Sequence, residues 1–235
     1  LPAACKGDIR FCFAITEADA GTNTINIGTL AKSTGQGGFK LSGNKTFITD
    51  AAESDYALVV ARTTPVSEVK RKTDVRGEIG KGFNILFDSL NPERILGGAI
   101  CTGIGRFAMD KAVAYANERV VFDGPIGAYQ ALQHPLAKAK TEVEMASLMA
   151  RKAAWLFDQG KPCGAEANMA KLASSEAGIK AVDASLQCFG GNGFTKEYGI
   201  FDLYPLVRLT KTAPINNEMI HNYIVEHVMG LPRSY

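Results

Sequence analysis

The strongest constraint on the fold is a stripe of apolar residues between positions 136 and 157, which recurs at alternating steps of three and four. This spacing predicts a long helix with one apolar face. The stripe consists of Leu136, Ala139, Val143, Ala146, Ala150, Ala153 and Phe157. A second stripe, which predicts another helix, consists of Met169, Leu172, Ile179, Val182 and Leu186. With further helices expected over 95–116 and 218–229, this part of the chain is predicted to form a helical bundle. Gly103-Ile104-Gly105 lies inside the first of these helices and predicts a packing contact.

The first part of the chain shows the alternation and turn residues of β structure. A strand is expected over 11–16, then a hairpin over 39–48 that turns at Ser42-Gly43-Asn44, and a third apolar strand over 56–61 beside the hairpin. A polar stretch over 66–80 precedes the helical patterns. The prediction is an α+β fold, in which a small antiparallel β domain at 1–74 is followed by an up-down helical bundle at 75–235.

Composition and charge narrow the possible functions. The net charge is only +2 and no dense basic run is interleaved with aromatic residues, so nucleic acid is not an expected partner. The five cysteines are widely spaced and form no C-x-x-C pair, which disfavours a disulfide framework or a zinc site and favours a reducing compartment. The three histidines make no metal-binding pair with carboxylates, and neither a membrane span nor a targeting segment is visible.

Two short segments have the residues of a ligand site. Phe13 to Asn23 runs from a strand into a turn of small residues, which lets a ligand approach the backbone N–H groups. Lys45 to Asp50 offers Phe47 as a flat face and Thr49 as a donor. By residue chemistry alone, each segment also fits an ordinary surface hairpin.

Four collinear motifs give this chain a specific resemblance. Phe13 to Asn23 matches (Phe/Tyr)-x-x-Thr-Glu-x-x-x-Gly-(Ser/Thr)-(Asp/Asn), and Lys45 to Asp50 matches Lys-x-(Trp/Phe)-Ile-(Thr/Ser)-(Asn/Asp). Glu118 to Phe122 with Gln130 matches Glu-Arg-x-x-Phe…Gln, and Gln187 to Phe194 matches Gln-x-x-Gly-Gly-x-Gly-(Phe/Tyr). The chain thereby resembles the acyl-CoA dehydrogenases over nearly its whole length.

The resemblance implies an FAD-dependent α,β-dehydrogenation of an acyl-CoA thioester, with reoxidation by an electron-transferring flavoprotein, in a homodimer or homotetramer. Thr22 is expected to meet acyl-CoA as well as flavin, and Arg94 to contact acyl-CoA. The resemblance assigns to FAD Phe13, Ile15, Thr16, Gly21, Thr22, Phe47, Ile48, Thr49, Arg119, Phe122, Gln130, Gln187, Gly190 and Gly191. The second half of this set, from Arg119 onward, is expected to reach the adenosine half of a flavin bound mainly by a neighbouring subunit.

The reaction needs one carboxylate to remove the α-proton. Many relatives carry it in a Tyr-Glu-Gly-Thr segment, where this chain has Asn217, whose amide cannot accept a proton. A minority place it in a Leu-x-x-Glu-Arg segment, which is present here as Leu90 to Arg94. Glu93 is therefore the predicted base, with Glu218 as the fallback. The alternative from local structure is that Asn91 caps a helix and Glu93 only interacts favourably with the helix dipole, which would lower the pKa of the Glu93 carboxyl.

The chain also departs from the family pattern. In this sequence the usual amino-terminal helical domain does not precede Leu1, and the β domain is shorter than usual, which indicates a truncated chain or a sequence of ordered residues only. If the chain were complete as written, its acyl site would lack part of one wall. Two alternatives follow: an acyl-CoA oxidase, and a catalytically inactive flavin- or CoA-binding assembly protein, which Asn217 and Met219 would suit. The expected location is the bacterial cytoplasm or the mitochondrial matrix.

Overall fold

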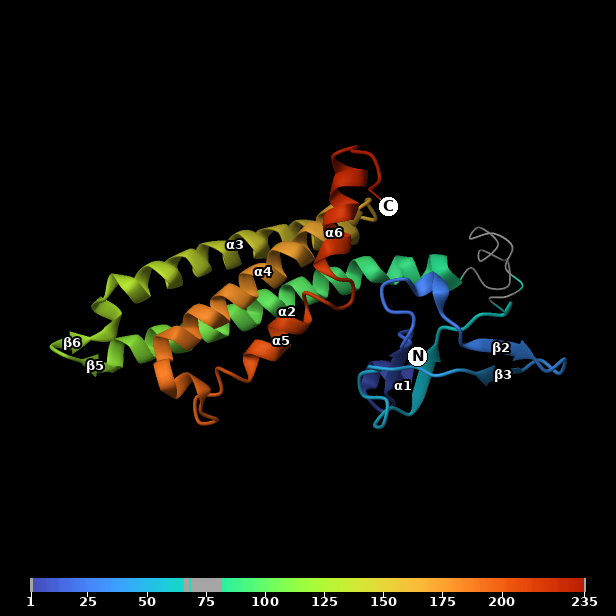
Figure 1. The fold of residues 1–235 in the computed structure, drawn as a ribbon, viewed down its shortest axis with the longest axis horizontal. Coiled ribbons are helices and arrows are strands. Elements are labelled where there is room, and N and C mark those ends of the chain that lie inside the picture. The colour runs from blue at the N-terminus through green and yellow to red at the C-terminus, as the bar shows by residue number, and fades with distance from the viewer. Residues whose placement is uncertain (1, 66–67, 69–81, 235) are drawn as a thin grey trace. The chain divides into compact units, whose positions relative to one another are not determined.

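The computed structural model describes residues 2–65, 68 and 82–234, which divide into two units, 1–86 and 87–235 (Figure 1). The predicted domain boundary at 74/75 lies outside the described residues. Among the described residues no helix is both long and apolar enough to span a membrane.

The first unit consists of short elements. They are α1 (Pro2–Lys6), β1 (Phe11–Ala14), the 3-10 helix η1 (Thr24–Asn26), β2 (Leu30–Ser33), β3 (Phe39–Ser42) and β4 (Tyr56–Val59). β1 and β4 pair in parallel, with Phe11 opposite Tyr56, whereas β2 and β3 form an antiparallel hairpin with Leu30 opposite Ser42. Cys12 and Ala14 of β1 are buried, and the chain beyond β4 reaches β2 through hydrogen bonds between Arg62 and its neighbours Thr29 and Ala31.

The predicted hairpin over 39–48 was wrong. β3 pairs with the preceding strand β2 around a turn at 34–38, where Gly35 and Gly37 have positive φ angles of 74° and 84°. After β3 the chain leaves the hairpin at Gly43, where a Cβ would lie within 2.7 Å of Thr29 Cα, so that only glycine fits. Residues 45–48 form no strand and lie beside the end of β1 instead. The third strand was predicted beside the hairpin, but it pairs with β1.

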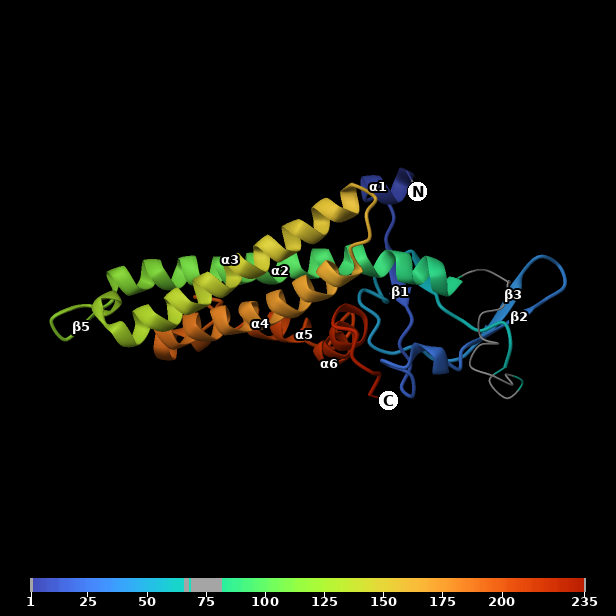
Figure 2. The same ribbon diagram turned by 90° about the horizontal axis from the view of Figure 1, so that it is seen from above.

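The second unit is the predicted helical bundle. Its elements are α2 (Gly82–Glu118), which begins in the first unit, β5 (Val120–Val121), β6 (Gly124–Pro125), η4 (Ile126–Ala128), α3 (Gln130–Asp158), α4 (Gly164–Phe189), η5 (Gly190–Phe194), α5 (Leu203–Leu209), α6 (Asn217–Tyr223) and the π-helix η6 (Ile224–Val228). The helices α2, α3 and α4 lie side by side along most of their length (Figures 1 and 2). The α+β fold with an up-down bundle is thereby confirmed, with the parallel β1–β4 pair as a departure from the expected antiparallel arrangement.

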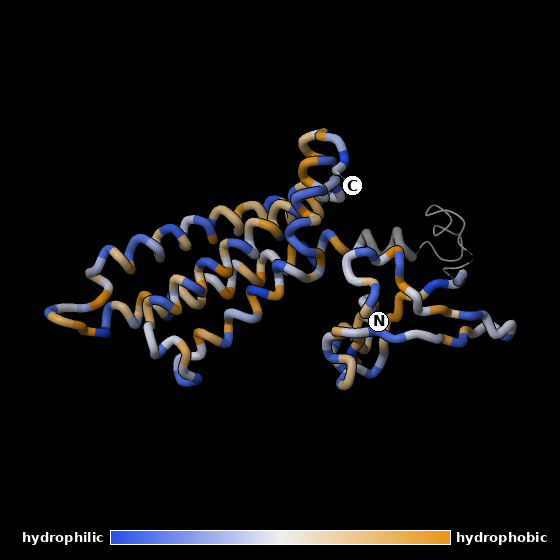
Figure 3. The backbone as a smooth tube through the Cα atoms, in the orientation of Figure 1, coloured by the Kyte–Doolittle hydropathy of each residue, from blue (hydrophilic) through white to orange (hydrophobic). Residues whose placement is uncertain are grey.

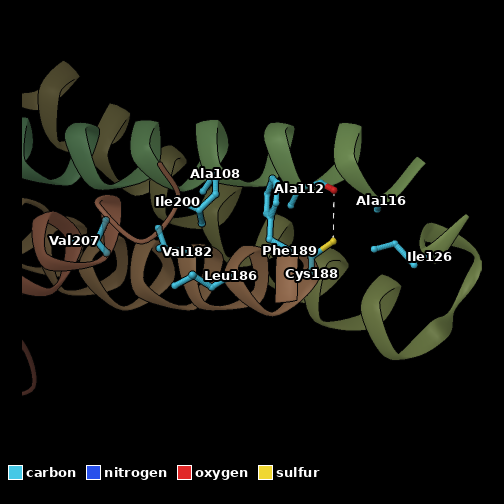
Figure 4. Packing of buried hydrophobic residues seen from close by; sticks show 10 residues of the cluster. All are labelled: Ala108, Ala112, Ala116, Ile126, Val182, Leu186, Cys188, Phe189, Ile200 and Val207. Carbon is cyan, nitrogen blue, oxygen red and sulfur yellow. Dashed lines mark hydrogen bonds between the residues drawn. The ribbon is translucent and has the colours of Figure 1, made fainter. Parts of the chain in front are cut away.

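The bundle packs through small residues. Hydrophobic and hydrophilic residues alternate along its helices (Figure 3), as the predicted stripes require. On α3 the predicted face is buried at Ala139, Val143 and Ala146, while on α4 the deepest residues are mostly Ala, Gly and Ser. Larger side chains gather toward one end, where Phe189, Leu186 and Ile200 pack with alanines of α2 (Figure 4).

Glycines allow α2 to pack closely against α3 and α4. A Cβ at Gly105 would lie 3.2 Å from both Ala181 Cβ and Val143 Cγ2, whereas a Cβ at Gly103 would meet nothing within 4 Å. The packing contact predicted for this segment is therefore made by Gly105, which lies where α2, α3 and α4 meet.

We expect Gly105→Leu to lower the free energy of unfolding by about 1–3 kcal/mol or more, because extra methylenes in a packed interior force the helices apart. Gly103→Leu is the matched control in the same helix. It should be neutral or slightly stabilising, since it removes a helix-interior glycine without filling occupied space. Chemical denaturation of both variants checks this, and equal losses would contradict the packing role of Gly105.

Candidate functional site

In the first unit the two predicted ligand segments lie next to each other. The backbone N–H of Thr46 donates to the carbonyl of Thr16 over 3.0 Å, and Lys45 Nζ donates to the carbonyl of Ile15 over 2.8 Å. Sequence reasoning placed the segments in one site without a contact between them. The structure supplies that contact at the end of β1.

An ion pair between Glu17 and Lys45 lies at the centre of this arrangement. Lys45 Nζ is 2.8 Å from Glu17 Oε1, and the two side chains are only 11% and 12% exposed. The Glu17 carboxylate also accepts the backbone N–H groups of Gly28 and Thr29. Burial alone would raise the pKa of the Glu17 carboxyl, but the hydrogen bonds from Lys45, Thr29 and Gly28 outweigh it and lower the pKa to about 2.

The side chains that flank this ion pair are largely open to solvent. Phe47 is 92% exposed and has a φ of 56°, a left-handed conformation that is uncommon for a bulky residue. Phe13 is 37% exposed, Ile15, Thr16 and Ile48 are half-buried, and Gly21, Thr22 and Thr49 are exposed. An aromatic ring held outward in a strained backbone conformation is typical of a binding surface.

In the second unit Glu93 lies about three turns inside α2, so the predicted helix start at Asn91 was wrong. Asn91 does not cap the helix; its Oδ1 accepts a hydrogen bond from Arg94 Nη1 over 3.1 Å. The helix-dipole argument for a lowered pKa therefore does not apply. Although Glu93 is an exposed residue, removal of water by the surrounding protein raises the pKa of its carboxyl, and the Arg94 charge opposes this.

Arg94 is more enclosed than its neighbour. Burial lowers the pKa of its guanidinium, while Tyr223 and Glu93 act in the opposite direction. Its Nε is buried and has no hydrogen-bond partner in the described part of the chain. A buried N–H without a partner carries a desolvation cost that a ligand acceptor could relieve.

Asn217, which stands where most relatives would have the base, is buried in a polar network. Its Oδ1 accepts from Lys171 Nζ over 2.8 Å, and its Nδ2 donates to Glu176 Oε1 over 3.0 Å. The network needs an acceptor toward the lysine and a donor toward the carboxylate, which an amide provides and a carboxylate does not. Glu218 is exposed in the first turn of α6, whose N-cap is Asn216.

Sequence reasoning missed Lys171. It is only 2% exposed on α4, and its Nζ also donates to the carbonyl of Ile215 over 2.6 Å. Burial lowers the pKa of this ammonium to about 8. The available signal was its position: Lys171 lies four residues after Ala167 and three before Ser174, on the small-residue face that packs inward.

The residues assigned to the adenosine half lie at the other end of the bundle. Arg119 directly precedes β5, and Phe122 lies in the turn between β5 and β6. Gln130 begins α3, Gln187 lies in the last turn of α4, and Gly190 and Gly191 begin η5. The two chain regions are joined through the core near Ala116, Ile126 and Phe189 (Figure 4). Phe122 is 88% exposed with a φ of 58°, which repeats the exposure and backbone conformation of Phe47.

No group of three or more potential metal ligands occurs among the residues that the structure describes.

Comparison with known proteins identifies the family. The family profile "Acyl-CoA dehydrogenase, middle domain" matches residues 12–77, and "Acyl-CoA dehydrogenase, C-terminal domain" matches residues 80–229. The acyl-CoA dehydrogenase FadE12 of Mycobacterium tuberculosis is 39% identical over an alignment that covers 100% of this chain and 71% of the relative. This alignment has 277 positions, more than the 235 residues of the chain, so some residues of the relative have no counterpart in this chain.

Solved structures agree. Butyryl-CoA dehydrogenase from Megasphaera elsdenii superimposes with a TM-score of 0.87 at 26% identity, covering 97% of this chain and 70% of that chain. A glutaryl-coenzyme A dehydrogenase solved with glutaryl-CoA gives a TM-score of 0.88 at 26% identity, covering 99% and 69%. With two family profiles matched in order and a close relative covering its full length, the chain belongs to the acyl-CoA dehydrogenase family of FAD-dependent oxidoreductases.

Proposed function

We propose that the protein oxidises an acyl-CoA thioester to the trans-2-enoyl-CoA, with Glu93 as the base that removes the α-proton. The observation that carries this proposal is the contrast between two positions. Asn217 is an amide locked in a buried network, whereas Glu93 is an accessible carboxylate whose pKa is raised by desolvation. A carboxylate with a raised pKa is the more effective proton acceptor.

The residues assigned to FAD fit that cofactor. Phe47 presents an exposed ring for the flat isoalloxazine, and a Cβ at Gly21, Gly190 or Gly191 would meet nothing within 4 Å, so a ligand can approach the backbone there. Arg119 is exposed and offers the planar donors that suit a pyrophosphate. When bound, FAD supplies the acceptor for the hydride that leaves the β-carbon of the substrate.

The chain's own residues have distinct roles in this proposal. Glu93 takes the α-proton, and the neighbouring Arg94 contacts the acyl-CoA, with its unpartnered Nε as an available donor. In this proposal Thr22 belongs to the turn where acyl-CoA and the cofactor phosphates would pass. Lys171 and Asn217 hold the segment before α6 against α4 and take no part in proton transfer.

The length of α2 supports a cofactor shared between subunits. Glu93 and the helix end at Glu118 are separated by about 38 Å at about 1.5 Å per residue. The flavin ring must lie near the base that acts on the same substrate. Because this distance exceeds the length of an extended FAD, Arg119 and Phe122 would reach the adenosine of a flavin whose ring lies at another subunit's Glu93. The proposal therefore requires a homodimer or homotetramer.

The proposed electron acceptor is an electron-transferring flavoprotein. One solved structure that resembles this chain, with a TM-score of 0.87 at 26% identity, is described as an electron transferring flavoprotein of Acidaminococcus fermentans. An oxidase would instead release peroxide during turnover, and an inactive assembly protein would bind acyl-CoA without bleaching its flavin. The five cysteines are free, which suits a reducing compartment such as the bacterial cytoplasm or the mitochondrial matrix.

Glu93→Gln should lower the rate of flavin bleaching by acyl-CoA about 10³-fold, the scale of general-base removal, while acyl-CoA still binds. The variant should lower to a similar extent the rate at which the α-hydrogen of the substrate exchanges with deuterium from the solvent, as measured by NMR. Glu218→Gln is the matched control, an exposed carboxylate changed to the same amide, and should leave both rates within a few-fold. The reverse pattern would move the base to Glu218.

The pH dependence of the reaction should report Glu93. The ionised carboxylate is the active form and its pKa is raised, so the bleaching rate should fall as pH drops through a midpoint above the ordinary value of 4.5. Stopped-flow measurement across this range checks the acid limb. Persistence of the same limb in Glu93→Gln would assign it to another group.

Mixed oligomers test the shared cofactor. Oligomers of Glu93→Gln alone and of Arg119→Ala alone should each be impaired at limiting FAD. When equal amounts are refolded together as dimers, about half of the dimers contain one subunit of each variant. In each such hybrid one of the two sites receives both native residues, so about one quarter of all sites should be active. Activity that stays at the level of the separate variants would show that Arg119 serves its own subunit.

A further inference from the structure

Two charged residues of the first unit, Glu17 and Lys45, have no role in the reaction proposed above. Each belongs to one of the two flavin segments, and each is nearly enclosed by protein. A lysine and a glutamate are rarely this buried unless they pair, and a buried pair is weak evidence for stability by itself. Their position between the segments points to another purpose.

The pair connects several pieces of backbone at once. Lys45 Nζ donates to the Ile15 carbonyl and to the Glu17 carboxylate, both over 2.8 Å, and so joins the first residue of the second segment to the first half of the first segment. Glu17 is fixed in turn by the backbone N–H groups of Gly28 and Thr29. Thr46, next to Lys45, donates its own N–H to Thr16.

Phe47 follows directly after these anchored residues. Its left-handed backbone conformation costs of the order of 1 kcal/mol, and with 92% of the residue exposed its own side chain does not compensate by burial. Such a conformation persists only where the surroundings impose it. The hydrogen bonds made by Lys45 and Thr46, the two residues before it, impose it here.

We propose that Glu17 and Lys45 are positioning residues, which fix the register of the two flavin segments and thereby hold Phe47 in the orientation that flavin binding needs. This inference rests on the flavin site proposed above. Preorganisation of this kind improves affinity because the ligand does not have to order the segment on binding.

The test is FAD binding to the apoprotein of the full-length chain, followed by quenching of flavin fluorescence. Lys45→Met should weaken FAD binding at least about tenfold, because FAD would then have to order the segment that carries Phe47, and an ordering cost of about 1.4 kcal/mol is one decade in affinity. Lys45→Arg keeps donors for both acceptors and should remain within about threefold of wild type. Lys40→Met, which removes an exposed lysine of β3 in the same unit, should leave binding unchanged.

A double-mutant cycle separates positioning from a general loss of structure. If Lys45 acts through Phe47, Lys45→Met should cost much less affinity in a Phe47→Ala background than in the wild type. Far-UV circular dichroism and denaturation of the apoproteins establish that the variants fold. If Lys45→Met does not fold, Lys45→Gln replaces it, because the amide can still donate to the Ile15 carbonyl but carries no charge toward Glu17.

The results discriminate clearly. Unchanged FAD affinity in a folded Lys45→Met or Lys45→Gln variant, or an equal loss with and without Phe47, would overturn the positioning role. Failure of the unmodified protein to bind FAD would overturn the proposed function instead.

Discussion

The close approach of three long helices is the constraint on which the second unit depends. α2 meets α3 and α4 where Gly105 faces Val143 and Ala181, and it meets α4 again where Gly178 lies against the backbone of Cys101. Side chains this small bring helix axes close together and leave little freedom for them to slide, because interiors are packed at crystal-like density. The bundle is consequently a rigid support, and those of its residues that we propose for catalysis and cofactor binding lie toward the two ends of α2 and its neighbours.

The network around position 217 explains why an amide is favoured over a carboxylate there. The amide of Asn217 faces α4 and satisfies Lys171 on one side and Glu176 on the other. Glu176 is bonded also to Lys211, so the network extends from α4 to the segment before α6. A carboxylate at 217 would face a second carboxylate at hydrogen-bond distance. The amide removes that repulsion, and the proposed base, Glu93, belongs to a different element, α2.

Periodicity predicted the helices well because each spans many residues and repeats its signal. The buried faces of α3 and α4 fall on or beside the expected stripes, but Phe157 of the first stripe is exposed, and Met169, Leu172 and Ile179 of the second are only half-buried. Alanines and serines take the interior of α4 instead. Hydropathy alone cannot tell whether a helix face made of alanines and serines is buried or exposed. Because the inward face of α4 is of this kind, its hydropathy did not indicate that Lys171 on that face is buried.

Short sequence signals for turns and helix starts gave wrong predictions where two of them lay close together in the chain or where longer-range structure overrode them. Asn91-Pro92 has the composition of a helix start, but Pro92 lies inside α2 because the helix had already begun at Gly82. The hairpin was misplaced because Ser42-Gly43-Asn44 and the glycines at 35 and 37 both encode turns, and pairing with β2 decided between them. The two predicted ligand segments lie next to each other, joined by hydrogen bonds from Thr46 to Thr16 and from Lys45 to Ile15, and their role in binding a ligand stays a prediction. Their charged partners Glu17 and Lys45 became meaningful only once their distances were known.

The uninterrupted run of α2 from Glu93 to Glu118 has a consequence for how such chains can diverge. Inserting or deleting one residue within it would rotate everything beyond by about 100° and shift it by about 1.5 Å. Glu93 and Arg119 would then face different directions, and the glycines against α4 would fall out of line. Length variation among related proteins is therefore expected to accumulate in the turns and in the β part of the chain. The number of residues between Glu93 and Glu118 should stay constant.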